Sequence, residues 1–168
     1  MKKILLILTL LMLTPLMSAQ GTDAELETLS GSIKPDSPLY GLDLALTNLR
    51  LQFIRDKALR AQLLIDVANE RLAEKTLMRL KGKEMQALRA EADETIKVRD
   101  AEDTLNSATN EEVKRNPDSF DVARVKLEQR TLVLNRVIEK LRDDGNPNND
   151  GAIGSLEAAR DRTKISSD

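Results

Sequence analysis

Apolar side chains recur every three or four residues along most of the chain after residue 38, which is the period of an amphipathic α-helix. The first such segment follows Pro35-Asp36-Ser37-Pro38, where Ser37 is placed to cap a helix and Pro38 to occupy its first turn. It runs to about Ile54. Apolar residues surround most of this helix, so we expect it to need packing partners on more than one side. They are Leu39, Leu42, Leu44, Ala45, Leu49, Leu51, Phe53 and Ile54.

Two further helices follow from the same periodicity. After a tight reversal at Arg55-Asp56, a longer helix continues to Gly82, with apolar positions at Leu59, Leu63, Leu64, Val67, Ala68, Leu72, Leu77 and Leu80. A weakly hydrophobic helix follows Gly82 and ends between Ser107 and Asn110. Its expected seam is Met85, Leu88, Ala92, Ile96, Ala101 and Leu105. Because one glycine costs only about 1 kcal/mol inside a helix, a single helix running through Gly82 is the alternative.

The last long helix is predicted to begin at Asn116-Pro117 and to end at Asp143-Asp144-Gly145. Phe120, Leu127, Leu134 and Leu141 are seven residues apart, with Arg130 and Thr131 interrupting the seam. Fewer than four clean heptads favour a bundle helix over a free coiled-coil dimer. Together these elements predict an all-α protein, an antiparallel bundle of four to five helices over residues 35–144.

Two blocks of the sequence resemble a known family. The start Pro35-Asp36-Ser37-Pro38-Leu39-Tyr40 and the later run Ala68-Asn69-Glu70-Arg71-Leu72-Ala73-Glu74, followed by Gly82-Lys83, are similar to a family of exported archaeal and bacterial helical domains of unknown function. The resemblance covers about residues 35–100 and implies a fold, not a reaction. It marks Pro35, Ser37, Pro38, Leu39, Tyr40, Glu70, Arg71 and Glu74 as structural motif residues.

Two expectations follow for these motif residues. Leu39 and Tyr40 should be buried against the second helix. Glu70, Arg71 and Glu74 are close neighbours on a helix, and we interpret them as forming surface or inter-helix ion pairs rather than a catalytic site.

Residues 1–19 have the pattern of a cleaved signal peptide, with Lys2 and Lys3, an apolar run from Ile4 to Leu13, and Ser18-Ala19 before the cut. The run is about half of the ~20 residues that span a bilayer, so we expect cleavage rather than a retained anchor. Residues 20–34, rich in Gly, Ser and Thr, are predicted to form a flexible tether. The mature chain, without a transmembrane anchor, is expected in the extracellular, periplasmic or cell-envelope space.

Composition argues against several classes of function. The chain has no cysteine and no histidine, which removes disulfides, thiolate nucleophiles, imidazole bases and the usual zinc and copper ligands. No Gly-x-Ser-x-Gly or Walker-type motif occurs, and we expect no enzymatic activity. Without Lys2 and Lys3, 24 of the 26 basic residues remain against 28 acidic ones, which gives no electrostatic reason to bind nucleic acid. Met78 and Met85 are interpreted as core residues rather than a copper-binding stripe.

Residues 146–157 resemble a twelve-residue calcium loop of the EF-hand or dockerin type. The predicted ligands are side-chain oxygens of Asn146, Asn148 and Asp150, the carbonyl of Ala152, a water at Gly154 and both carboxylate oxygens of Glu157, with Gly151 at the turn. Only two carboxylates predict weak binding, in the ~0.1–1 mM range of extracellular modules. The alternative for residues 145–168 is a helix C-cap at Gly145, a plain turn and a short helix from about 155 to 164.

The expected function is that of an exported, non-enzymatic structural or protein-interaction module of the cell envelope, with an envelope or extracellular protein as partner and Ca²⁺ as the one candidate cofactor. The alternative is an extracytoplasmic helical chaperone or stress-binding protein, which needs an exposed concave apolar face. Two points stay open in the sequence: the oligomeric state, and whether helix 117–144 packs on the first three helices or on another molecule.

Overall fold

The computed structural model describes residues 26–165, which form helices joined by short turns, with no strand among them. The helices are α3 (Tyr40–Phe53), α4 (Lys57–Leu80), α5 (Glu84–Asn106), α6 (Asn110–Arg115), α7 (Pro117–Asp143) and α8 (Asp150–Ile165), with a 3-10 turn η1 (Pro147–Asn149) before α8. The predicted all-α fold is confirmed. The predicted signal peptide lies outside the described residues.

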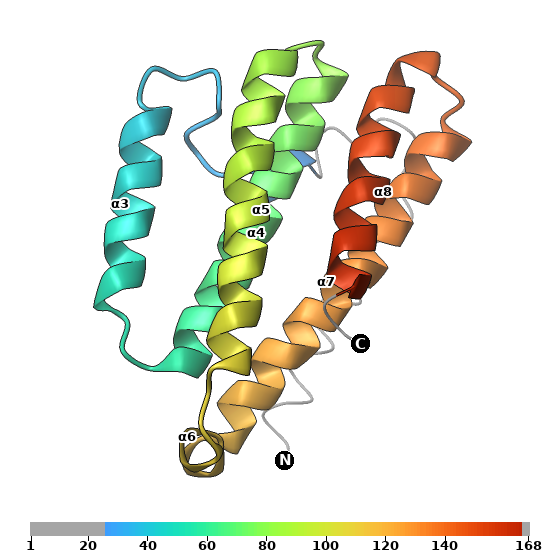
Figure 1. Cartoon of the computed structure of the whole chain (residues 1–168). Helices are drawn as coiled ribbons and strands as arrows, with labels where there is room; N and C mark the ends of the chain where they lie inside the picture. The colour runs from blue at the N-terminus through green and yellow to red at the C-terminus, as the bar shows by residue number, and fades with distance from the viewer. Residues whose placement is uncertain (1–25, 166–168) are drawn as a thin grey trace.

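Helix α4 is the central element, because α3, α5, α7 and α8 all contact it. Figure 1 shows α5 running antiparallel beside α4, while α7 and α8 form a second antiparallel pair on the other side of the bundle. Helix α3 stands at the edge of the bundle, next to α4 and α5. None of the helices within residues 26–165 has the length and apolar character that crossing a bilayer requires.

The long helix α7 packs on α4 of the same chain. This answers the question, left open by the sequence, of whether it packs on the first helices of the bundle. Leu134, Ile138 and Leu141 form a buried cluster with Leu72 of α4 and Leu156 of α8. At the other end of α7, a second cluster contains Phe120 and Ala123, packed with Ala58, Ala61 and Leu105. The predicted heptad positions Phe120, Leu134 and Leu141 are therefore confirmed as core positions, and Leu127 is partly buried.

Local signals set the helix boundaries close to the predicted positions. Asp56 caps α4, its Oδ1 accepting a hydrogen bond from Leu59 N at 3.0 Å. Gly82 and Gly145 end helices with φ values of 66° and 62°, a conformation that costs glycine little. The alternative of one helix running through Gly82 is therefore wrong. Helix α6 was not predicted, although Thr109 and Glu112 form a capping box that marks its start.

Helix α3 begins two residues later than predicted. Its N-cap position is Leu39, without a side-chain cap, and the Ser37 hydroxyl instead accepts a hydrogen bond from Leu39 N at 3.2 Å. Residues 37–40 thus form a turn before the helix. Tyr40 is 4% exposed and confirms its predicted burial, whereas Leu39 is 56% exposed, so its predicted burial was wrong. Leu39 stands in this turn, one residue before the helix, where its side chain stays exposed.

The buried seam of α5 also differs from the predicted one. Its buried residues are Ala87, Ala90, Glu94, Lys97, Val98, Ala101 and Leu105. Met85, Leu88 and Ile96 are exposed, so Met85 is not a core residue, whereas Met78 of α4 is buried as predicted. The physical reason is that α5 turns the charged residues Glu94 and Lys97 inward, where they meet partners of opposite charge or hydrogen-bonding capacity.

The part of the predicted tether that the structure describes packs on the bundle. Residues 26–29 form a helical turn, and Leu26 is buried. Gly31 lies so close to the Glu70 carboxylate that a Cβ at this position would collide with it. Residues 20–25 lie outside the described part of the chain.

Candidate functional site

Buried and partly buried charged side chains connect α3, α4, α5 and α7. We call them the buried ionic network. Its members are the cations Arg71, Lys75, Arg79, Lys97 and Arg130 and the carboxylates Asp43, Glu74, Glu91, Asp93 and Glu94. Taking charges out of water is costly, and it is tolerated only where each charge has partners of the opposite sign. With five cations and five carboxylates, the network is balanced.

Arg71 is the first centre of this network, and its side chain is almost completely buried. Its Nη1 donates to both carboxylate oxygens of Glu74, at 2.7 and 2.9 Å. Nη2 donates to Asp43 of α3 at 2.7 Å, and Nε donates to Asp93 of α5 at 3.2 Å. One guanidinium group therefore holds three helices together.

Tyr40 completes this centre. Its hydroxyl donates to Glu74 Oε2 at 3.0 Å, and the Arg71 guanidinium lies 5.1 Å from the centroid of its ring. Burial and the charge of Glu74 raise the pKa of Tyr40, which keeps the hydroxyl a donor. Burial is the largest single effect on the pKa of Arg71 and lowers it, but the hydrogen bonds to Glu74 and Asp43 and the electrostatic interactions with Glu74 and Tyr40 together outweigh burial, so the pKa of Arg71 is raised. The guanidinium therefore stays protonated.

Glu94 is the second centre. Its Oε2 lies 3.3 Å from Nζ of Lys75 on α4, and its Oε1 pairs with Arg130 of α7. Arg130 also donates to Asn69 of α4 at 2.7 Å. The residue that interrupts the heptad seam of α7 is thus buried because it pairs with a carboxylate of α5.

Asp93 and Lys97 attach α3 to α5. Lys97 Nζ lies 3.1 Å from Asp93 Oδ1 and donates to Asn48 Oδ1 of α3 at 2.7 Å. Since Asp93 Oδ2 accepts from Arg71, both oxygens of this carboxylate are occupied by cations. The negative charge of Asp93 is therefore neutralised, and the role of this part of the network is to hold α3, α4 and α5 in position.

The structure brings together Tyr40, Arg71 and Glu74, which the family resemblance had marked, as an ion-pair centre between helices. Glu70 lies beside them, and burial raises its pKa against the opposing charge of Arg71. Pro35 is buried, whereas Pro38 and Leu39 are exposed. Sequence reasoning missed Asp43, Asp93, Glu94 and Lys97. The one available signal was Arg130, a charge at the seam of an otherwise apolar heptad helix.

A groove of about 450 Å³ lies beside the network, between the start of α3 and the middle of α5. We call it the α3–α5 groove. Its lining residues are Ser37, Pro38, Tyr40, Gly41, Leu44, Arg89, Ala92, Asp93 and Ile96. Asp93 is already paired, while Arg89 is exposed and forms no ion pair within residues 26–165. The groove therefore combines apolar walls with one unneutralised guanidinium.

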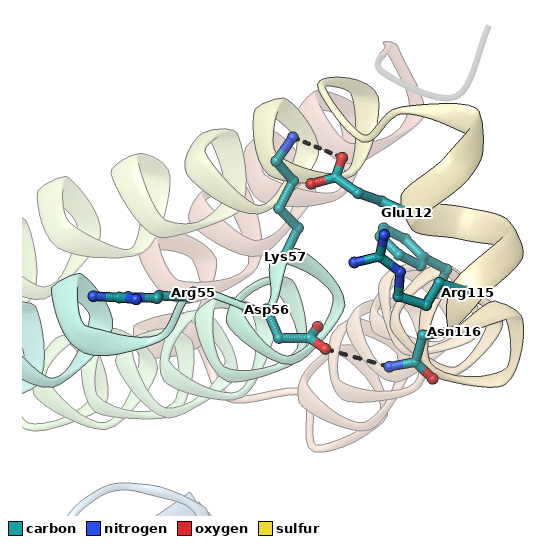
Figure 2. A pocket seen from close by; sticks show the side chains of 7 residues that line it. Arg55, Asp56, Lys57, Glu112, Arg115 and Asn116 are labelled. Atoms are coloured by element: carbon teal, nitrogen blue, oxygen red, sulfur yellow. Dashed lines mark hydrogen bonds and ion pairs between the residues drawn. The ribbon is translucent and has the colours of Figure 1, made fainter.

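A smaller hollow of about 140 Å³ lies where α6 meets the start of α4. Figure 2 shows two polar contacts in it: Lys57 pairs with Glu112 at 3.0 Å, and Asn116 donates to Asp56 at 3.3 Å. Arg55 points away from this group. These contacts connect α6 to the cap of α4, and we assign the hollow no ligand.

The residues of the predicted calcium loop lie in a turn and in α8. Asn146 precedes η1, and Asp150 begins α8, so Ala152 and Glu157 are helical. Ala152 is buried in the core, while Glu157 Oε1 accepts from Arg142 at 2.5 Å. The side chain of Asn148 lies outside what the structure describes. Calcium binding stays a prediction, and it requires residues 150–154 to leave the helix.

Asn149 has the anchoring role in this turn. It is buried and donates to the carbonyl of Leu141 at 3.2 Å and to Asp144 at 3.1 Å, which ties the turn to the end of α7. Within residues 26–165, no group of three or more carboxylate, histidine or cysteine side chains is arranged to hold a metal ion.

Comparison with known proteins finds one family. The model of a family described as "Domain of unknown function (DUF5667)" matches residues 32–143. No curated protein and no solved structure matches the chain. The matched range contains the motif residues, the whole buried ionic network and the α3–α5 groove, and it ends before the predicted calcium loop.

Proposed function

The chain belongs to the DUF5667 family of domains of unknown function, and from its sequence and structure together we propose that it is an exported, non-enzymatic protein-interaction module of the cell envelope. The observation that carries this proposal is the α3–α5 groove. A hollow with apolar walls on a base held by ion pairs is suited to receive a segment of another protein.

The surface around the groove supports this role. Met85, Leu88, Ala92 and Ile96 lie on one face of α5, and all four are exposed. They extend the apolar wall of the groove along the helix. Contiguous exposed apolar surface of this kind is a mark of interaction sites.

The charge of the groove indicates the chemistry of the partner. The carboxylate of Asp93 is neutralised by Arg71 and Lys97, so Arg89 supplies the net charge at the rim. A guanidinium binds carboxylates with paired hydrogen bonds. The partner is therefore an apolar segment of an envelope protein that carries a carboxylate.

Capture of envelope proteins tests the proposal, with residues 20–168 as bait and three variants, of which Leu132→Asp is the control. Ile96→Asp places a charge in the groove, and Leu132→Asp places one on the exposed surface of α7, where Leu132 is 66% exposed. We expect wild type and Leu132→Asp to retain the same proteins, and Ile96→Asp and Arg89→Glu to lose them. Equal capture by all four chains would overturn the proposal.

A helical chaperone is the second candidate, and the same groove favours it, because a chaperone needs a concave apolar face. The two functions differ in selectivity. A chaperone suppresses the aggregation of unrelated unfolded proteins and binds an apolar dye in the folded state. An interaction module instead binds one defined partner, with saturable binding, and does not suppress the aggregation of unrelated proteins. Aggregation assays with two unrelated unfolded proteins separate them.

A further inference from the structure

Helix α3 has a second apolar face, which the bundle does not cover. Tyr40 and Leu51 are buried on the inner side. On the opposite side, Leu39, Leu42, Leu46, Leu49 and Phe53 are 56, 57, 57, 49 and 77% exposed. We call these five residues the outer stripe. A helix that is apolar all round is normally covered on all sides. Because the outer stripe is about half exposed or more, residues 26–165 do not supply its cover.

The spacing of the outer stripe indicates the shape of its partner. Its members alternate by three and four residues, which is the a and d pattern of a helix that packs along another helix. In Figure 1, α3 stands at the edge of the bundle, where a second helix can approach. The stripe is separate from the wall of the α3–α5 groove, which Gly41 and Leu44 line.

We propose that the outer stripe packs against the outer stripe of a second copy of this chain, with the two α3 helices antiparallel. In that register, Leu46 faces Leu49 of the second copy, and Leu42 faces Phe53. Leu42, Leu46, Leu49 and Phe53 thereby each meet an apolar residue of the other helix, while Leu39 lies beyond the paired part of the stripe. The pattern is self-complementary, as a two-fold interface requires.

Charge complementarity fixes the second copy as the partner and sets the direction. Asp43 and Arg50 are the two charged residues of α3, and both lie along the same edge of the outer stripe, seven positions apart. Antiparallel pairing places Asp43 of each copy opposite Arg50 of the other. Asp43 binds Arg71 through Oδ2, and its side chain is 30% exposed, which leaves Oδ1 to accept from Arg50 of the second copy. Arg50 is exposed and forms no ion pair in the described part of the chain.

The other edge of the stripe agrees with this arrangement. Ala45 and Gln52 lie there, and the antiparallel register places them opposite each other. Neither is charged, so no repulsion opposes the approach. Parallel pairing would instead leave Asp43 and Arg50 without partners of opposite charge across the interface.

Sedimentation equilibrium of residues 20–168 tests the dimer. We expect a concentration-dependent dimer for the wild type, and at least a tenfold weaker dimer for Leu46→Asp and for Arg50→Glu. Leu132→Asp and Ile96→Asp are controls that should leave the dimer intact. Because Leu46 is exposed, helicity and melting temperature of the monomer should not change. A monomer at all concentrations, or a dimer that survives Leu46→Asp, would overturn the proposal.

Engineered cysteines test the direction, since the chain has none of its own. After oxidation, a mixture of Leu42→Cys and Phe53→Cys chains should form a mixed disulfide dimer, while neither variant should cross-link alone. Cross-linking of Leu42→Cys with itself would indicate parallel helices and contradict the proposal. The Ile96→Asp control separates this inference from the proposed function. If Ile96→Asp loses the captured proteins but still forms the dimer, the groove and the outer stripe are two independent binding sites.

Discussion

The Tyr40 hydroxyl and the Glu74 carboxylate, 34 positions apart in the sequence, lie 3.0 Å apart in the interior of the bundle. Tyr40 belongs to the first sequence block that resembles the family, and Glu74 belongs to the second. The two blocks therefore meet in space, with Arg71 bound to Glu74 and its guanidinium over the Tyr40 ring. The buried ionic network gives a physical reason for their joint occurrence.

Removing the hydroxyl of Tyr40 should lower stability. Tyr40→Phe keeps the ring but leaves Glu74 with one donor fewer in the interior, and we expect a loss of about 1–3 kcal/mol. Leu39→Ala is the neighbouring control, and because Leu39 is more than half exposed, we expect it to lose less than about 1 kcal/mol. Denaturant unfolding measures both. Equal midpoints for wild type and Tyr40→Phe would contradict the assigned hydrogen bond.

Removing the charge of Arg71 should cost more. Arg71→Met leaves Glu74, Asp43 and Asp93 without their shared cation, and breaking a buried pair on one side typically costs about 3–5 kcal/mol. Arg99→Met is the matched control, since Arg99 is exposed and pairs only loosely with Asp103 at 3.8 Å. The urea midpoint should fall strongly for Arg71→Met and stay unchanged for the control. Similar midpoints for the two variants would refute a stabilising role of this centre.

The carboxyl group of Glu70 should make stability fall as pH rises. Burial raises its pKa above the ordinary 4.5, so the folded state binds the proton more tightly than the unfolded state. Its contribution is fully present below pH 4.5 and is lost as pH rises through the folded pKa. Glu70→Gln should therefore be more stable than the wild type at pH 7, with a smaller difference at pH 4. A variant less stable than the wild type at pH 7 would contradict this.

Glu112 should act in the opposite direction. The backbone N–H of Thr109, together with Lys57, lowers the pKa of Glu112 to about 2. The stability that its carboxylate contributes is present above the ordinary value of 4.5 and is lost as pH falls toward 2. Glu112→Gln should remove this part of the acid dependence, which circular dichroism between pH 5 and pH 2 measures. An unchanged acid profile would show that the capping box contributes nothing.

The calcium hypothesis predicts a ligand-dependent melt. At a calcium concentration ten times the dissociation constant, binding to the folded state adds about RT ln 11, or ~1.4 kcal/mol. Magnesium, which demands a smaller and more rigid octahedral site, should not raise the melting temperature. Glu157→Gln should abolish the calcium shift. Because coordination requires residues 150–154 to leave α8, calcium should also lower the helical signal slightly. An equal shift in Glu157→Gln, or no shift in the wild type, would contradict the calcium hypothesis and leave residues 146–157 with the role of a connection between helices.

The sequence by itself determined the helices and their ends. Asp56, Gly82, Pro117 and Gly145 act within one turn of their own position, through caps, a positive φ or a missing amide donor, so their effect could be read locally. The seven-residue spacing of Phe120, Leu134 and Leu141 likewise predicted the inner face of α7. The family resemblance drew attention to Tyr40, Arg71 and Glu74 but did not show what they bind.

Only the tertiary structure decided which face of each helix is buried. Helix α5 turns Glu94 inward because Lys75 and Arg130 are there to pair with it, and Arg130 lies 36 positions away in the sequence. The energy of such a pair depends on the position of both charges in a medium from which water is excluded. The spacing of apolar residues along the sequence does not indicate where these two charges lie in space. The same spacing therefore predicted burial for Leu88 and Ile96, which the structure exposes, and it could not tell which of the two apolar faces of α3 the bundle would cover.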